Sequence, residues 1–188
     1  MASFSKAAVA DIIAGLNLEE SNRVFAAHWL SLWDGDMLPS SRKFNPSGLK
    51  TFLPGLLKFE VVPDRRVTVR LAGTGYAYVF KTDPTGSDWI EAAPVTHRAN
   101  RLKVFSAIAR GAILVAHRRV GMLSSEDFVS EEVFVPFAPD PGGAVPVLGR
   151  VNFTPSQFVR IRSIAQVTGD PLDHALVPFP RSEGLGFS

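Results

Sequence analysis

One stretch of the sequence, residues 66–84, constrains the fold more than any other. Its first part alternates apolar and polar side chains, the period of two that is typical of a strand with one buried face; the apolar members are Val67, Val69 and Leu71. Gly73 and Gly75 then interrupt the strand, and an aromatic run follows. A strand that passes through a glycine break into a short aromatic helix is suited to form the wall of a small cavity.

Composition indicates a single globular domain with extensions. The chain has 188 residues, of which 46% are hydrophobic and 20% are charged, so it can bury a substantial core. It contains no cysteine. Disulfides, zinc–thiolate sites, iron–sulfur clusters, a cysteine nucleophile and a flavin photosensor that forms a cysteine adduct are therefore excluded.

Neither a membrane nor a nucleic acid is indicated as a partner. Residues 1–16 read as a short amphipathic helix rather than a signal peptide, because Asp11 interrupts their apolar part. No run approaches the roughly 18 apolar residues of a membrane span, and we expect a cytoplasmic protein. Basic residues concentrate in residues 61–120, but they are scattered over several elements, which argues against a nucleic-acid surface.

The order of elements predicts an α+β fold. Helices are expected at 5–15, 21–33, 46–53 and 97–111, short helical pieces at 74–92, and strands at 56–62, 66–72, 112–121, 130–138 and 144–153. A leading hairpin and a trailing meander can pair through their inner strands into a five-stranded antiparallel sheet, with the middle helices on one face. This organisation gives a helical extension (1–55), a core (56–154) and a C-terminal arm (155–188).

Several short motifs occur in a characteristic order. A Pro39-Ser40-Ser41-Arg42 turn follows the aromatic helix, Leu53-Pro54 ends the next helix, and Arg70-Leu71-Ala72-Gly73-Thr74 ends a strand. Phe80 and Thr85-Gly86 come next. Between them stands Asp83-Pro84, at a place where an Asp-Leu pair would be the more regular form of this order of motifs. Residues 28–153 thereby resemble the PAS_5 family of PAS domains. The resemblance implies a PAS-like sheet, N-terminal helices that often support dimers, and a role in sensing or signalling without defined catalysis.

Two groups of residues are expected to organise the molecule outside the cavity. Phe25, Trp29 and Trp33 recur every four residues on one helix, which favours core or dimer packing, and we predict a dimer or partner interface there. Arg70 should face away from the cavity and anchor the N-terminal helices through Asp34 or Asp36. Gly73 and Thr74 are predicted to be structural.

The predicted cavity suits a small, mostly apolar or aromatic ligand held by one or two polar groups. Its expected lining is Tyr76, Phe80, Trp89, Phe105, His117 and Val135. The alternative is a filled core with no ligand. No cofactor is indicated: the four histidines lack metal-ligand spacing, His97 lacks the further features of a haem site, and flavin is not supported either. Glu131 and Glu132 cannot share one site, because neighbours in a strand point to opposite faces.

These expectations leave two functions open. The first is a sensor that binds a small ligand and acts through a separate partner protein, since no effector domain is recognisable in the chain. The second is a ligand-free adaptor that works as a homodimer or through protein–protein contact. We expect no enzymatic activity, because no nucleophile, metal cluster or acid–base pair stands out.

Overall fold

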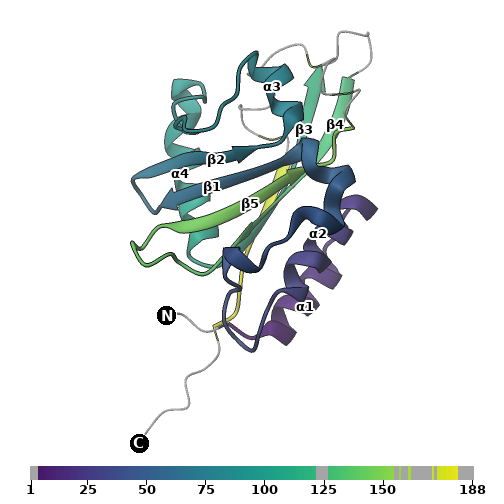
Figure 1. Ribbon diagram of the computed structural model, residues 1–188, viewed down its shortest axis with the longest axis vertical. Coiled ribbons are helices and arrows are strands. Elements are labelled where there is room, and N and C mark those ends of the chain that lie inside the picture. Colours follow the sequence, from purple (N-terminus) through teal and green to yellow (C-terminus); the bar gives the residue numbers. More distant parts are fainter. Residues whose placement is uncertain are drawn as a thin grey trace, which may run out of the picture.

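One antiparallel sheet forms the centre of the molecule. The computed structural model describes residues 4–121, 127–154, 157, 161, 171 and 173–181. Its six strands lie in the order β2-β1-β5-β4-β3-β6. The elements are α1 (Lys6–Gly15), α2 (Glu20–Ser31), η1 (Ser41–Lys43), η2 (Pro46–Gly55), β1 (Leu56–Val62), β2 (Arg66–Ala72), α3 (Thr74–Phe80), α4 (Val95–Ala109), β3 (Ala112–Gly121), β4 (Asp127–Pro136), β5 (Val145–Val151) and β6 (Asp173–Pro178) (Figure 1). The leading hairpin and the trailing meander join through β1 and β5, the first and the last of the five strands predicted from the sequence.

Local sequence signals account for the start of η2 and for the hairpin turn. The side chain of Asn45 accepts a hydrogen bond from Ser47 N at 2.9 Å, and Pro46 occupies the first turn, where its missing N–H group leaves no helical hydrogen bond unmade. Between β1 and β2, Asp64 adopts a positive φ of 59°, which an aspartate tolerates better than most residues. The hairpin therefore closes directly after Val62.

A sixth strand corrects the prediction of five. β6 lies in the segment that we expected to be an arm, and it pairs with β3 from Ala112↔Pro178 to His117↔Asp173. Without β6, this edge of β3 would present unpaired backbone groups. The remainder of the predicted arm, apart from Gln157, Ile161, Pro171 and 179–181, lies outside the described residues.

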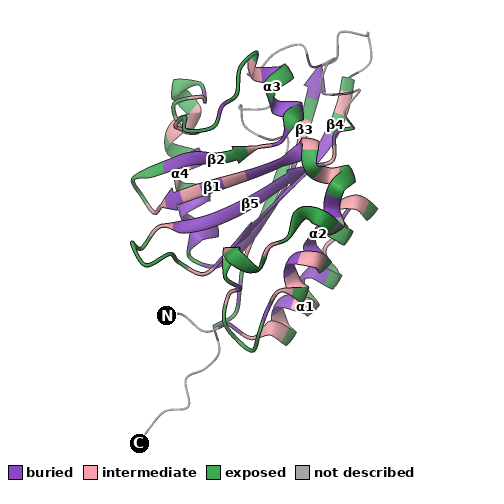
Figure 2. Ribbon diagram, in the orientation of Figure 1, coloured by how far each residue is buried: buried purple, intermediate pink, exposed green. Residues whose placement is uncertain are grey.

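Helices cover both faces of the sheet, whereas the sequence predicted helices on one face. We call the face under α1, α2 and η2 the outer face, and the face under α3 and α4 the inner face; Figure 1 shows the two helical layers on opposite sides. Each face has its own apolar core. β5 is buried along its whole length, as is the second half of β4 (Figure 2). Near-continuous apolar runs are typical of strands covered on both faces.

The aromatic residues of α2 belong to the outer core. Phe25 and Trp29 are fully buried, Trp33 is 4% exposed, and the Trp29 and Trp33 rings meet edge to face at 5.3 Å. Trp29 Nε1 also donates to the carbonyl of Pro136 at 2.9 Å. These side chains are enclosed within one protomer, so they do not form the surface interface that the sequence suggested. Their spacing reflects packing of α2 on the sheet.

Arg70 pairs with a different acid from the one expected. Its Nη2 lies 2.8 Å from Glu60, a residue of the neighbouring strand β1 on the same face. Asp34 instead pairs with Lys43 at 3.6 Å, and Asp36 accepts from Lys6 N at 3.1 Å. Cross-strand proximity decides this pairing, because Arg70 and Glu60 are neighbours in one hairpin. The segment that carries Asp34 and Asp36 offers Arg70 no such fixed neighbour.

Gly73 has the structural role predicted for it. Its N–H donates to Leu56 O at 2.7 Å, and a Cβ at this position would lie 2.5 Å from the carbonyl oxygen of Pro54. Thr74 starts α3 immediately after this close approach. The glycine therefore lets the end of η2 pack directly on the junction between β2 and α3.

Candidate functional site

A small pocket lies between the inner face of the sheet and α4. It offers about 50 Å³ to the centre of a water-sized sphere, enough for a few ordered waters or a small ligand. Its lining combines apolar and polar residues: Leu57, Tyr76, Trp89, Asn100, Arg101, Val104, Phe105, Leu114, Ala116, Arg118, Glu132, Phe134, Val151, Phe153, Pro171 and His174.

Aromatic rings make the apolar wall of the pocket rigid. Phe105 of α4 packs against Phe134 of β4 with 5.6 Å between ring centroids. Phe59 lies 5.0 Å from Phe105 and 5.3 Å from Trp89. Edge-to-face and tilted contacts at such distances stabilise aromatic clusters beyond the area they bury. These packed rings form the apolar wall of the pocket.

A buried ion pair supplies the polar side of the pocket. Arg118 Nε donates to Glu132 Oε1 at 2.8 Å, and both side chains are about nine-tenths buried. Arg101, also buried, donates to the carbonyl of Trp89 at 3.1 Å and lies over the Trp89 ring. Charged groups are therefore held beside the aromatic wall of the pocket, where the low local dielectric strengthens their hydrogen bonds.

Tyr76 brings a hydroxyl group to the same cavity. The residue is 5% exposed. Burial raises the pKa of its phenol well above the ordinary value, and the negative charge of Glu132 raises it further, whereas Arg118 and Arg150 oppose this shift to a lesser degree. The phenol therefore stays protonated at neutral pH, and its O–H group can act as a donor.

The structure brings together three of the six predicted lining residues. Tyr76, Trp89 and Phe105 line the pocket. Phe80 does not line it but packs behind Trp89 at 5.8 Å between centroids. His117 and Val135 point to the outer face: Val135 belongs to the outer core and His117 contacts outer-face acids.

The two errors have one physical cause. Strand neighbours alternate between faces, and Ala116 and Phe134 line the pocket, so His117 and Val135 must point away from it. His117 shares a face of β3 with Ile113 and Val115, and that face lies under the N-terminal helices.

Sequence reasoning missed Arg118 and Glu132 as pocket residues. The alternation of β3 contained the signal for Arg118, because it shares a face with Leu114 and Ala116. The opposite orientation of Glu131 and Glu132 is confirmed: Glu132 lines the pocket, whereas Glu131 contacts α2.

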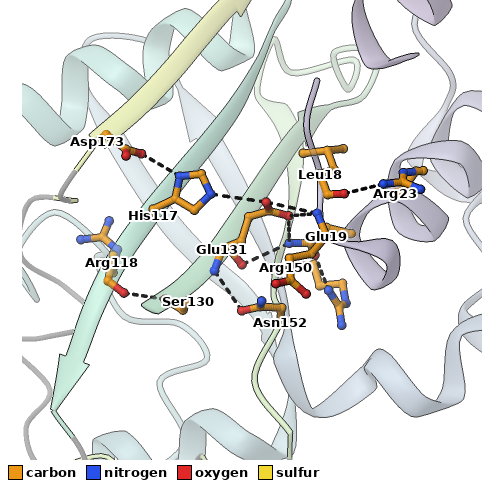
Figure 3. A network of polar contacts seen from close by, with 11 residues as sticks. Leu18, Glu19, Arg23, His117, Arg118, Ser130, Glu131, Arg150, Asn152 and Asp173 are labelled. Atoms are coloured by element: carbon orange, nitrogen blue, oxygen red, sulfur yellow. Dashed lines mark hydrogen bonds and ion pairs between the residues drawn. The ribbon is translucent and has the colours of Figure 1, made fainter. Parts of the chain in front are cut away.

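A second polar cluster lies on the outer face, beneath the start of α2. The Glu131 carboxylate accepts from Asn22 Nδ2 at 2.7 Å and from Glu19 N at 3.1 Å, and His117 Nε2 approaches it to 3.4 Å (Figure 3). Arg150 contacts Asn22 Oδ1 and lies over the Phe52 ring at 4.3 Å. Burial lowers the pKa of Arg150 to about 10, which still leaves it charged at neutral pH.

Two classes of site find no support in the part of the chain that the structure describes. Over those residues, no group of three or more histidine, aspartate or glutamate side chains is arranged to hold a metal ion. Within the same residues, no helix has the length and apolar character needed to cross a membrane.

Comparison with known proteins identifies the family. Searches of curated proteins and of solved structures each found no match. The model of the PAS_5 family, described as a PAS domain, matches residues 18–152, which include α2 and all strands of the sheet except β6. The strand order β2-β1-β5-β4-β3, the inner pocket and this match lead to one conclusion: the chain belongs to the PAS_5 family of PAS domains.

Proposed function

We propose that this chain is a sensory PAS domain whose inner pocket binds a small organic ligand and whose output passes through a partner protein. Membership of the PAS family suggests a sensory or signalling role. The observation that carries the ligand proposal is the buried Arg118–Glu132 pair, which faces an aromatic pocket together with Tyr76.

Energetics favour a binding role for this pair. Removing two charges from water costs several kcal/mol per ion, and replacing such a pair by apolar residues is often neutral or stabilising for the fold. A buried pair is therefore a weak source of stability. It is well suited to orient a ligand, because it presents a cationic donor and an anionic acceptor side by side.

The pocket also limits the ligand to a narrow chemical class. A volume of about 50 Å³ accessible to a water-sized sphere admits only a small molecule. The aromatic wall of Trp89, Phe105 and Phe134 favours a flat apolar part, and Glu132 favours a donor such as an amine, amide or hydroxyl group. We propose a binding rather than a catalytic role for these groups.

One specific observation favours an adaptor as the second candidate. Leu53, Leu71 and Tyr78 are 38%, 49% and 55% exposed, and they come from η2, β2 and α3, which meet at Gly73. Exposed apolar side chains on elements that meet at one junction suit contact with another protein. In the sensor proposal the same surface would carry the output, since α3 also supplies Tyr76 to the pocket.

A thermal-shift screen distinguishes the two candidates. The wild-type protein is tested with a panel of small aromatic amines, amides and alcohols, beside Glu132→Gln and Ala116→Leu, in which a leucine side chain fills the pocket from β3. Ala14→Leu, on the exposed side of α1, is the matched control. The sensor proposal predicts ligands that raise the melting temperature of the wild type and of Ala14→Leu but not of Ala116→Leu, with a reduced shift for Glu132→Gln. Shifts that are equal in all four proteins would contradict binding in this pocket.

A further inference from the structure

Three pairs of consecutive residues link the outer polar cluster to the inner pocket. His117-Arg118 lies on β3, Glu131-Glu132 on β4 and Asp173-His174 on β6. His117 is in register with Glu131 on one side and with Asp173 on the other. The first member of each pair lies on the outer face, and the second member lines the pocket. Each outer residue is therefore joined through the backbone to a residue of the polar wall of the pocket, so that a movement of the first can displace the second.

His117 bridges two carboxylates from different strands. Its Nδ1 lies 2.7 Å from Asp173 Oδ1, and its Nε2 lies 3.4 Å from Glu131 Oε2 (Figure 3). A neutral imidazole has only one N–H group, so it can donate to one of these acids at most. The imidazolium form can donate to both. The geometry thus fits protonated His117.

We propose that His117 is a proton-dependent clasp that fastens the edge strand β6 to the sheet and, through Asp173 and His174, sets the position of one wall of the pocket. The clasp goes beyond ligand binding, because it operates whether or not the pocket is filled.

The two ends of the clasp differ in strength. Glu131 is 2% exposed and keeps its bonds to Asn22 Nδ2 and Glu19 N without the histidine. The Asp173 side chain is 72% exposed, and among the described residues His117 is its one side-chain partner. β6 is also an edge strand with its residues mostly exposed. Loss of the proton should therefore loosen β6 and leave β4 and α2 in place.

The charges around His117 determine the direction of the pH effect. Burial alone would lower the pKa of His117, but the hydrogen bond and charge of Asp173, followed by the charge of Glu131, outweigh it and raise the pKa above the ordinary value. Figure 3 shows three further charged groups near this cluster: Glu19 and Arg23 near the start of α2, and Arg150 on β5. Arg119, which is exposed and lies two residues beyond His117 on β3, shares the same face of that strand. Because the folded-state pKa is raised, the stabilisation is complete below about pH 6.5 and is lost as the pH rises through the raised value.

Hydrogen exchange of the β6 amides tests the clasp. Protection of β6, corrected for the intrinsic effect of pH and referred to β1, is measured on the full chain from about pH 5.5 to about pH 8.5. We expect a severalfold loss of β6 protection in the wild type, with a midpoint above the ordinary histidine value. His117→Gln and the exposed Asp173→Asn should show low β6 protection throughout and no pH dependence.

His174→Gln is the matched control, because it removes a histidine from the same strand but from the pocket side. It should keep the pH dependence of the wild type. The clasp is disproved if β6 protection in the wild type is the same at both ends of the pH range, or if His117→Gln keeps the transition. Since Asp173→Asn alters an exposed side chain, it tests the idea even if His117→Gln folds poorly.

Discussion

At the scale of single residues, close backbone approach explains Gly73 better than backbone conformation does. Its φ of −62° is open to any residue. An added Cβ, however, would overlap the carbonyl oxygens of Leu53 and Pro54, which belong to backbone and cannot rotate away. The glycine motif of the sequence is thus a packing requirement at the junction of η2, β2 and α3.

Gly73→Ala should destabilise the protein by at least about 2 kcal/mol, because the overlap forces η2 away from the sheet. Gly15→Ala is the control: a Cβ at this helical position meets nothing within 4 Å, so the change should be neutral or stabilise by up to about 1 kcal/mol. Urea denaturation of both variants measures the difference. Equal stabilities would show that the approach at Gly73 is not tight.

Individual polar residues were the hardest to assign from the sequence. Arg70 was correctly placed away from the cavity, but its partner Glu60 was missed, although the two are close together in a predicted hairpin. The partners of His117 depend on which strands flank β3. One of the two strands that flank β3 is β6, which lies in a segment with no clear strand pattern. The pair of acids around His117, Glu131 and Asp173, could therefore not be predicted from residue spacing alone.

At the scale of elements, the recurrence of Phe25, Trp29 and Trp33 every four residues along α2 is explained by packing of this helix on the outer face of the sheet. Trp29 is fully enclosed and hydrogen-bonded through Nε1. Trp29→Ala should therefore cost about 3–5 kcal/mol of stability.

Val24→Ala provides the matched comparison on the same helix, since Val24 is 47% exposed. Its effect should stay within about 0.5 kcal/mol. Both variants are compared by chemical denaturation. A small effect of Trp29→Ala, accompanied by dissociation of a dimer, would support an interface through α2 and contradict the enclosed packing.

The bounds of most elements followed from periodicity, and the number of covered faces did not. β1 and β2 were predicted with the bounds observed, because apolar and polar side chains alternate along both sequences. Leu71, which the alternation places on the buried face of β2, is instead 49% exposed, because the register of the β1–β2 pair shifts between Val69 and Leu71. β5 is instead a nearly continuous apolar run through Val145, Val147, Leu148 and Val151. Such a run is the sequence signal of a strand covered on both sides, and reading it that way would have placed the N-terminal helices on the outer face.

At the scale of the whole molecule, the sheet separates two layers that differ in how they are packed. The outer face carries the tightly packed α1 and α2 layer together with the His117 cluster. The inner face carries the pocket, with charged groups in place of part of its apolar lining. Because alternate residues of the same strands serve both faces, events on one face can reach the other without a long pathway.

Native mass spectrometry of the freshly purified protein tests the central claim, that the inner pocket holds a small ligand, most directly. The sensor proposal predicts a stoichiometric extra mass, or one that appears on adding a ligand found in the thermal-shift screen, for the wild type and Ala14→Leu. Ala116→Leu should show the mass of the bare chain under the same conditions. Bare-chain mass for all three proteins, with and without those ligands, would contradict the sensor proposal and favour the adaptor.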